Sequence, residues 1–119
     1  MPSLTITTTH GKEAAEKATL AFIIANNAAA SDQDTAVFLM AESVWFATPG
    51  GADGVQHEGM DPLAKPLGAF VENGGKLWVC GACAKPRGIT DDKLVPGAKI
   101  MTAANLVERL ANGSASLSI

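Results

Sequence analysis

The alternation of apolar and polar positions in the first third of the chain predicts a strand, a helix and a second strand. Residues 4–9 (LTITTT) alternate and are rich in β-branched side chains, which is typical of a strand. Residues 35–40 (TAVFLM) are almost continuously apolar, as expected of a strand buried on both faces of a parallel sheet. Between them, residues 12–28 carry an apolar stripe at helical spacing, formed by Ala14, Ala18, Ala21, Phe22 and Ala25.

The rest of the chain predicts two helices and three strands. A long glycine-rich segment comes first, over residues 48–62, and its length is unusual for a loop in a compact domain. The regular elements that follow are a helix over 66–73, strands over 76–80 and 99–101, a helix over 103–112 and a strand over 114–119. Residues 81–88 (GACAKPRG) predict only a turn or a single helical turn, because Pro86 limits a longer helix.

Strands that alternate with helices favour an α/β fold. We therefore expect one domain over residues 1–119, with three layers (α/β/α) around a mostly parallel sheet. In such sheets, ligands bind at the carboxyl ends of the strands. This edge would receive His10, the loop 48–62 and Cys80, because each follows or ends a predicted strand.

Composition narrows the classes of function. The chain has 119 residues, 47% hydrophobic and 18% charged, with a formal net charge of −3, as in ordinary globular domains. It has no cluster of Lys and Arg, so we expect no nucleic acid partner. Residues 1–10 do not resemble a signal peptide, and the apolar stretches are too short to span a membrane, so we expect a cytoplasmic protein without a membrane partner. The glycines match no phosphate-binding motif, and we expect no cofactor.

The two cysteines of the chain, Cys80 and Cys83, lie close together in the sequence at the end of a predicted strand. Cys80 ends this strand, where its sulfur can be exposed at the edge of the sheet. Cys83 lies about one helical turn later, so the two sulfurs can share a face. Lys85 and Arg87 come next, and their charges can stabilise a thiolate. Cys80 and Cys83 are therefore the candidate catalytic residues.

Less reactive roles for these cysteines stay open at this point. Cysteine is among the residue types most often buried, so the two side chains can simply pack in the core. A reversible disulfide is a further alternative. A zinc site would need more ligands, and the only nitrogen donors, His10 and His57, lack the usual spacing to the cysteine pair. We therefore expect no metal.

Other polar residues of the same predicted edge could position a substrate or act as a general base. These candidates are His10, after the first strand, Glu42, after the second strand, and the loop residues His57 and Glu58. For the loop residues, a solvated surface with incidental charges is the alternative, and His10 could instead cap the helix that follows it. Trp45 lies in a segment that a neighbouring subunit could bury.

Trp78 alternates with its apolar neighbours in the strand 76–80, so we expect it in the core.

The stretch LWVCGACAKPRGI, residues 77–89, resembles the DsrE/DsrF-like family, including its YchN-like and TusD-like branches. Members carry a cysteine at the end of the third strand and an Arg-Gly pair shortly after it, which here correspond to Cys80 and Arg87-Gly88. The resemblance implies a parallel five-stranded sheet in the order 4-3-2-1-5 and homo-oligomers, commonly trimers or hexamers. In the sulfur-relay branches, the cysteine carries sulfur between proteins as a persulfide. Only Cys80 matches that position, and Cys83 lies outside the relay pattern.

Three functions follow as hypotheses. The first is a cytoplasmic sulfur carrier or sulfurtransferase, in which Cys80 accepts sulfur from donor proteins, passes it to acceptor proteins and is resolved by Cys83. The second is a redox-active or redox-sensing dithiol formed by the same two residues. The third is a non-catalytic oligomeric module that binds a small ligand, with the loop 48–62 as a lid.

Overall fold

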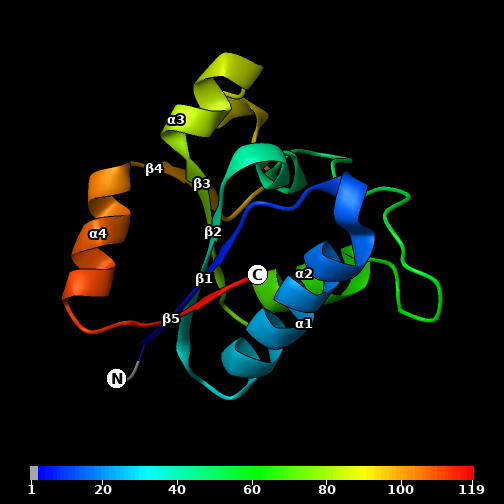
Figure 1. Cartoon of the computed structure of the whole chain (residues 1–119), viewed down its shortest axis with the longest axis horizontal. Coiled ribbons are helices and arrows are strands. Elements are labelled where there is room, and N and C mark those ends of the chain that lie inside the picture. The colour runs from blue at the N-terminus through cyan, green and yellow to red at the C-terminus, as the bar shows by residue number, and fades with distance from the viewer. Residues whose placement is uncertain (1–2) are drawn as a thin grey trace.

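The computed structural model describes residues 3–119 as a five-stranded sheet with helices on both faces (Figure 1). The strand order is β4-β3-β2-β1-β5, and every neighbouring pair is parallel. The expected α/β fold and strand order are therefore confirmed. The strands are β1 (Ser3–Thr8), β2 (Asp34–Leu39), β3 (Lys76–Cys80), β4 (Ala98–Met101) and β5 (Ala115–Ser118).

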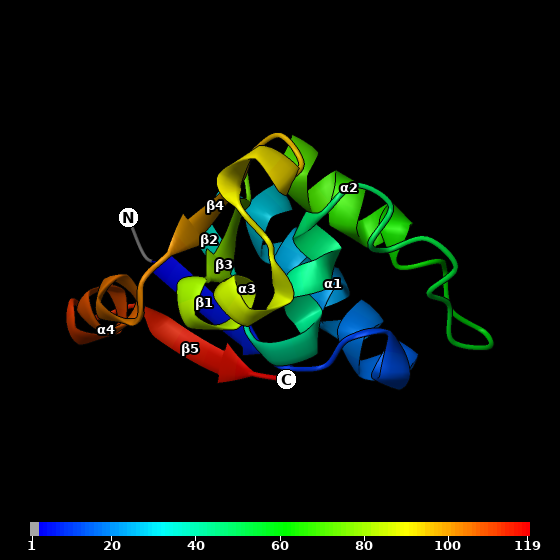
Figure 2. The ribbon, with the colours of Figure 1, turned by 90° about the horizontal axis from the view of Figure 1, so that it is seen from above.

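The helices divide unequally between the two faces of the sheet. Figure 2 shows α1 and α2 on one face and α4 on the other. The α-helices are α1 (Ala15–Ala30), α2 (Ala64–Glu72), α3 (Gly81–Ala84) and α4 (Ala103–Ala111). Short 3₁₀ helices complete the chain: η1 (Lys12–Ala14), η2 (Ala41–Ala47), η3 (Lys85–Arg87) and η4 (Asp91–Lys93). Among residues 3–119, no helix is long and apolar enough to cross a membrane.

The main core lies between the sheet and the pair of helices α1 and α2. Alternate residues of β2 and β3, such as Val37 and Val79, point into it and are fully buried. The small residues of α1 let it lie close to the sheet, and its Phe22 packs edge-on against Phe70 of α2, with ring centroids 5.9 Å apart. The apolar stripe predicted on the first helix is thus the face that builds this core.

The opposite face is covered more thinly. α4 contributes no buried residue, and its N-cap Thr102 accepts a hydrogen bond from the Asn105 backbone amide. Trp78 lies on this face, where the guanidinium of Arg109 stacks over its ring at 5.2 Å. Trp78 is only half-buried, so the expectation that it lies in the core is wrong. The strand was predicted correctly, but its second face has only a short helix to cover it.

Two further predictions require correction. Residues 12–28 do not form one helix: η1 ends at Ala14, whose backbone angles (φ −134°, ψ 67°) are not helical, and α1 begins only at Ala15. Residues 41–47 were assigned no element, yet they form η2 directly after β2. Both deviations occur just beyond the carboxyl ends of strands, where the chain turns back over the edge of the sheet.

Candidate functional site

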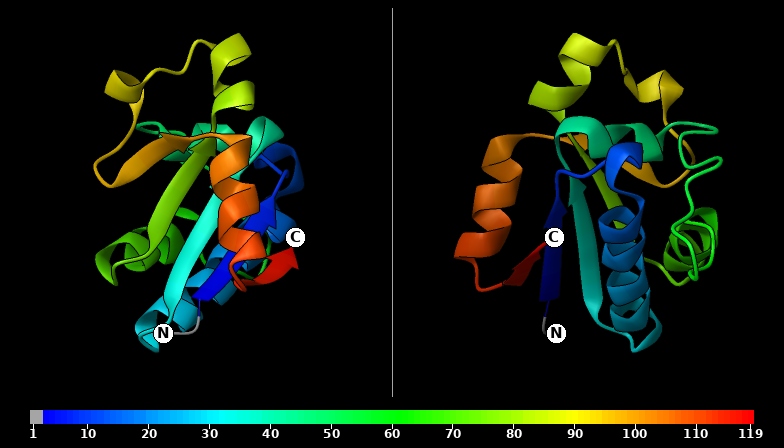
Figure 3. Two further views of the ribbon diagram at one scale, coloured as in Figure 1. Left: turned by 90° about the vertical axis from the view of Figure 1, so that its left-hand side faces the viewer. Right: turned by 45° about the vertical axis from the view of Figure 1, so that its right-hand side comes forward.

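Cys80 is the last residue of β3, and its place in the strand sets the direction of its side chain. Alternation along a strand puts Cys80 on the same face as Trp78, the face covered by α4. Cys80 pairs in register with Met101, the last residue of β4, and α3 begins at the next residue. Figure 3 shows α3 standing beyond the carboxyl ends of the strands. Cys80 as a whole is 8% exposed, so this residue lies close beneath the surface of the edge.

The surroundings of Cys80 act on its acidity in opposite directions. Burial has the largest influence and raises the pKa of the Cys80 thiol above its ordinary value. The backbone amides of Cys83 and Ala82 lower the pKa, because they face the sulfur and stabilise its anion. The Cys83 side chain, which acts as a hydrogen-bond partner of the Cys80 sulfur, raises it. The net result is a thiol that is mostly protonated at neutral pH.

Cys83 lies on α3, half-buried, and approaches Cys80 closely enough to influence its protonation. Both cysteines are free thiols. Gly88 then ends the turn in the left-handed region (φ 69°), which a glycine adopts without strain. The tight return of the chain after Pro86 therefore limits α3 to one turn and keeps both sulfurs beside the end of β3.

Arg87 holds the cysteine turn, which is the segment of α3 and η3 that carries Cys83, against η2. Its Nη1 donates to the Cys83 carbonyl oxygen at 3.0 Å, and its Nε lies 3.4 Å from Glu42 Oε2. The Arg87 side chain is half-buried, with 27% of it exposed. These contacts fix the position of α3. Lys85 is exposed beside this turn. A direct role of Arg87 or Lys85 in stabilising the thiolate stays a prediction.

The two histidines lie in different surroundings. His10 follows β1, and its Nδ1 is buried without a hydrogen-bond partner among the residues that the structure describes. Its side chain does not cap η1, which begins after Gly11. His57 lies in the loop after η2, where its Nε2 is 3.6 Å from Glu16 Oε2 on α1. The structure thus pairs His57 with a helix carboxylate, whereas His10 stays at the edge of the sheet.

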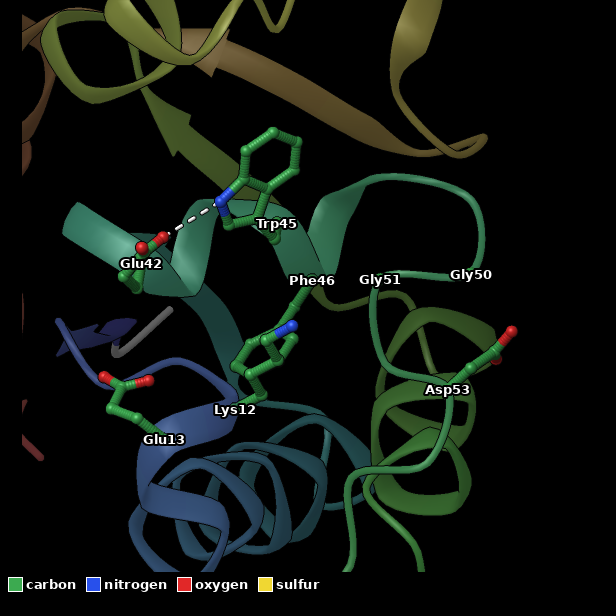
Figure 4. Close-up of a pocket in the computed structure, with 8 residues that line it drawn as sticks. All are labelled: Lys12, Glu13, Glu42, Trp45, Phe46, Gly50, Gly51 and Asp53. Carbon is green, nitrogen blue, oxygen red and sulfur yellow. Dashed lines mark hydrogen bonds between the residues drawn. The ribbon is translucent and has the colours of Figure 1, made fainter.

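A pocket of about 470 Å³ opens at the same edge. It is lined by residues of η1, of η2 and of the loop after η2: Lys12, Glu13, Glu42, Trp45, Phe46, Gly50, Gly51 and Asp53 (Figure 4). Trp45 Nε1 donates to Glu42 Oε2 at 2.9 Å, and the Trp45 side chain is 40% exposed. The predicted loop 48–62 therefore contributes one wall of a pocket through its first residues.

The pocket depends on how η2 is fixed to the ends of the strands. The Ser43 hydroxyl, fully buried, donates to the Thr8 carbonyl oxygen at 2.9 Å and so ties η2 to β1. Ala41 takes the left-handed region (φ 53°), which costs a non-glycine residue energy and marks a sharp, specific turn after β2. Gly51 lies so close to the Trp45 carbonyl oxygen that a Cβ atom would come within 1.8 Å of it. A larger residue at position 51 would push the loop off η2.

Sequence reasoning identified Glu42 and Trp45 but missed three charged residues of the pocket. Lys12 and Glu13 were assigned to a continuous helix, and Asp53 was one of several acidic residues in the loop 48–62. The position of Lys12 and Glu13 shortly after β1 could have indicated their role, because residues that follow a parallel strand lie at the ligand-binding edge of the sheet. Within residues 3–119, no group of three or more His, Cys, Asp and Glu side chains is arranged to hold a metal ion.

Comparisons with solved structures show the fold. The chain superposes over its full length on the crystal structure of the ychN protein from E. coli, with a TM-score of 0.74 and 18% identity, covering 100% of both chains. MTH1491 of Methanobacterium thermoautotrophicum, a protein of unknown function, gives a TM-score of 0.75 at 14% identity, again over 100% of both chains. BT1422 of Bacteroides thetaiotaomicron gives 0.68 at 21% identity, over 98% of this chain and 94% of that chain.

Sequence comparison gives a family and a curated relative. The model of the DsrE/DsrF-like family matches residues 3–119. The uncharacterized protein MJ0760 of Methanocaldococcus jannaschii is 31% identical over 108 residues, which is 91% of this chain. The match spans only 39% of the length of that relative.

Proposed function

Because the chain belongs to the DsrE/DsrF-like family, we propose that it carries sulfur as a persulfide on Cys80. The observation that supports this most directly is the place of Cys80: it ends β3 at the ligand-binding edge of the sheet, 8% exposed, with a second free thiol beside it. A shallowly buried sulfur can be reached by a donor in contact with this edge.

Sulfur loading requires one exchange step. The Cys80 thiolate attacks the outer sulfur of a donor persulfide, R–S–SH, and a bond forms between the two sulfur atoms. The bond between the donor's two sulfurs breaks, its electron pair leaves with the donor as the thiolate R–S⁻, and Cys80 becomes Cys80–S–SH. Burial raises the pKa of Cys80, so only a small fraction is thiolate at neutral pH, and the backbone amides of Ala82 and Cys83 partly offset this by stabilising the attacking anion.

Sulfur release uses Cys83, which lies beside Cys80 as a free thiol. The Cys83 thiolate attacks the inner sulfur of Cys80–S–SH, forms the Cys80–Cys83 disulfide and expels HS⁻. The protein has then been oxidised to a disulfide, and a thiol reductant must restore both cysteines before the next cycle. Transfer to an acceptor thiolate would instead leave both cysteines reduced.

Intact-protein mass spectrometry after exposure to a persulfide donor tests this function. The wild-type protein should gain the mass of one sulfur atom, and Cys80→Ser should gain none. Cys83→Ser is the matched control, and it should gain sulfur and retain it longer than wild type does. Equal gain by wild type and Cys80→Ser, or no gain by either, would overturn the proposal.

A redox dithiol is the second candidate, and the proximity of the Cys83 side chain to the Cys80 sulfur favours it. Cys80 and Cys83 would then form a reversible disulfide without carrying sulfur. Counting free thiols across a series of glutathione potentials separates the two functions. Paired loss of two thiols without any persulfide gain supports the dithiol. Thiols that never pair exclude it, and they also exclude the release step proposed for Cys83.

We further propose that the protein acts as a homo-oligomer in the reducing cytoplasm, where both thiols stay free. The exposed face of α4 is the candidate interface, because Val107 there is 62% exposed. Trp45 is less suited to this role, since its indole N–H is bonded to Glu42 within the chain. Sedimentation velocity should give a trimer or hexamer, and Val107→Glu should weaken it. A monomeric wild-type protein would contradict this assembly.

A further inference from the structure

The pocket between η1, η2 and the following loop has features that belong to no step of sulfur transfer. Its volume, about 470 Å³, falls within the range of small-molecule sites. Trp45 offers a half-exposed aromatic face, and Phe46, 2% exposed, lies beneath the surface at its side. Cys80 and Cys83 do not line it. The pocket is therefore a separate candidate for ligand binding.

The charges of this pocket favour a cation. Three of its lining residues are carboxylates and one is an amine. Glu42 is compensated by Arg87, whereas Glu13, Asp53 and Lys12 have no ion-pair partner among residues 3–119, which leaves the pocket with one net negative charge. One oxygen of Glu13 accepts from the Gly11 backbone N–H at 2.9 Å. A cation can also lie against the face of an exposed tryptophan, where the ring quadrupole attracts it. An ammonium group next to a compact apolar part therefore fits both the carboxylates and the aromatic wall.

Glu42 connects this pocket to the cysteine turn. Its Oε2 accepts from Trp45 Nε1 at 2.9 Å on the pocket side and lies 3.4 Å from Arg87 Nε on the other. Arg87 in turn donates to the Cys83 carbonyl oxygen at 3.0 Å. A positive ligand that draws the Glu42 carboxylate toward itself would loosen the contact to Arg87. The hold of Arg87 on α3 would then weaken.

We propose that this pocket binds a small organic ammonium compound and that Glu42 transmits its presence through Arg87 to Cys83. The binding step does not depend on sulfur transfer, because it and the reactivity of Cys83 are both measured without a persulfide. A protein that carries no sulfur could therefore still bind the ammonium compound. Likewise, a protein that does not bind the ammonium compound could still carry sulfur.

Two-dimensional NMR of the full chain tests the binding step, with the indole N–H signals of Trp45 and Trp78 as reporters. The probes are 2-phenylethylammonium, its neutral analogue 2-phenylethanol and the anion 3-phenylpropanoate. Only the cation should shift the Trp45 signal at low concentration, while Trp78, on the far face of the sheet, stays unchanged. A shift of equal size with the neutral or anionic probe, or no shift with the cation, would overturn the proposed ligand class.

Two substitutions sharpen this test because they should act in opposite directions. Asp53→Asn removes an attractive charge and should weaken binding of 2-phenylethylammonium by up to about fivefold, as for an exposed charge pair. Lys12→Met removes a repulsive charge and should strengthen binding to a similar degree. Weaker binding by Lys12→Met would contradict the assignment of the ligand as a cation.

The transmission step is tested on Cys83 alone, in the Cys80→Ser background. Alkylation of Cys83 by iodoacetamide should become faster when 2-phenylethylammonium is added. Glu42→Gln should give the faster rate without the ligand and make it insensitive to the ligand. Binding at the Trp45 signal with no change in the alkylation rate would overturn the transmission through Glu42.

Discussion

The two ends of the sheet differ in how their polar groups are satisfied. At the amino ends of the strands, the Asp34 carboxylate receives Lys76 Nζ at 2.8 Å and Arg109 Nη1 at 3.4 Å, and Arg109 also donates to the Thr5 hydroxyl at 2.8 Å. At the carboxyl ends, two free thiols lie side by side, and His10 Nδ1 is buried without a partner among residues 3–119.

This difference separates stabilising from reactive polar groups. A buried polar group that is fully bonded stabilises the fold, whereas an unpaired one costs free energy and is retained where it has another role. Backbone strain does not separate the two ends, because left-handed residues lie on both sides of β2: Asp32 (φ 62°) before it and Ala41 (φ 53°) after it. We infer that the amino end fastens α4 to the sheet, whereas the carboxyl end holds the residues of the proposed sulfur chemistry.

Arg109→Met should produce the largest change in stability and separate the two ends most clearly. The Arg109 side chain is only 12% exposed and donates to several oxygens at the amino end, so its loss should lower the free energy of unfolding by about 2–3 kcal/mol. Urea denaturation measures this loss. Lys65→Met, which breaks an exposed pair with Asp61, is the control and should cost less than about 0.5 kcal/mol. Sulfur loading per folded molecule should not change in either variant.

The pH dependence of Cys80 alkylation should reveal its burial. Because burial raises the pKa of this thiol, its alkylation rate in the Cys83→Ser variant should climb about tenfold per pH unit and continue to climb beyond the ordinary thiol range. The native protein holds this proton more tightly than the unfolded chain, so stability from this group is present at low pH and declines as pH rises through the native pKa. A rate that levels off below pH 8 would contradict a buried Cys80.

The amino end should lose stability at the opposite extreme of pH. The pKa of Asp34 lies below its ordinary value of 3.8, chiefly because Lys76 donates a hydrogen bond to its carboxylate. The hydrogen bond from Arg109 lowers this pKa further. This contribution is present above the pKa of the unfolded carboxyl and is lost as pH falls through the lower native value. Asp34→Asn should therefore flatten the acid limb of the unfolding profile. An unchanged acid limb would mean that these ion pairs do not stabilise the fold.

His57→Gln should have the smallest effect. Its imidazole is 44% exposed and lies 3.6 Å from Glu16, so its loss should cost less than about 0.5 kcal/mol. Sulfur loading, measured by intact mass, should stay at the wild-type rate, whereas His10→Gln, at the reactive edge, should alter it. A loss of sulfur loading in His57→Gln would contradict this prediction and would mean that His57 takes part in loading.

Sequence patterns predicted the fold well because the two periodicities are strong in the central elements. The strand 76–80 was placed to the residue, and the predicted alternation of strands and helices along the chain agrees with the structure. The strand order 4-3-2-1-5 came from the family resemblance and is confirmed by the sheet topology. Alternation could not reveal that Trp78 lies beneath Arg109, because the cover of the second face depends on how α4 docks. The pocket was also hidden, since η2 has no apolar period of its own and its position depends on the Ser43 bond to Thr8.

The central claim is that Cys80, and not Cys83, receives the transferred sulfur. Fragmentation of the peptide that contains both cysteines, after brief loading of the wild-type protein with a persulfide donor and alkylation, locates the added sulfur atom. We expect the added sulfur on Cys80 at the earliest times, followed by the Cys80–Cys83 disulfide. First appearance of the sulfur on Cys83 would contradict this account.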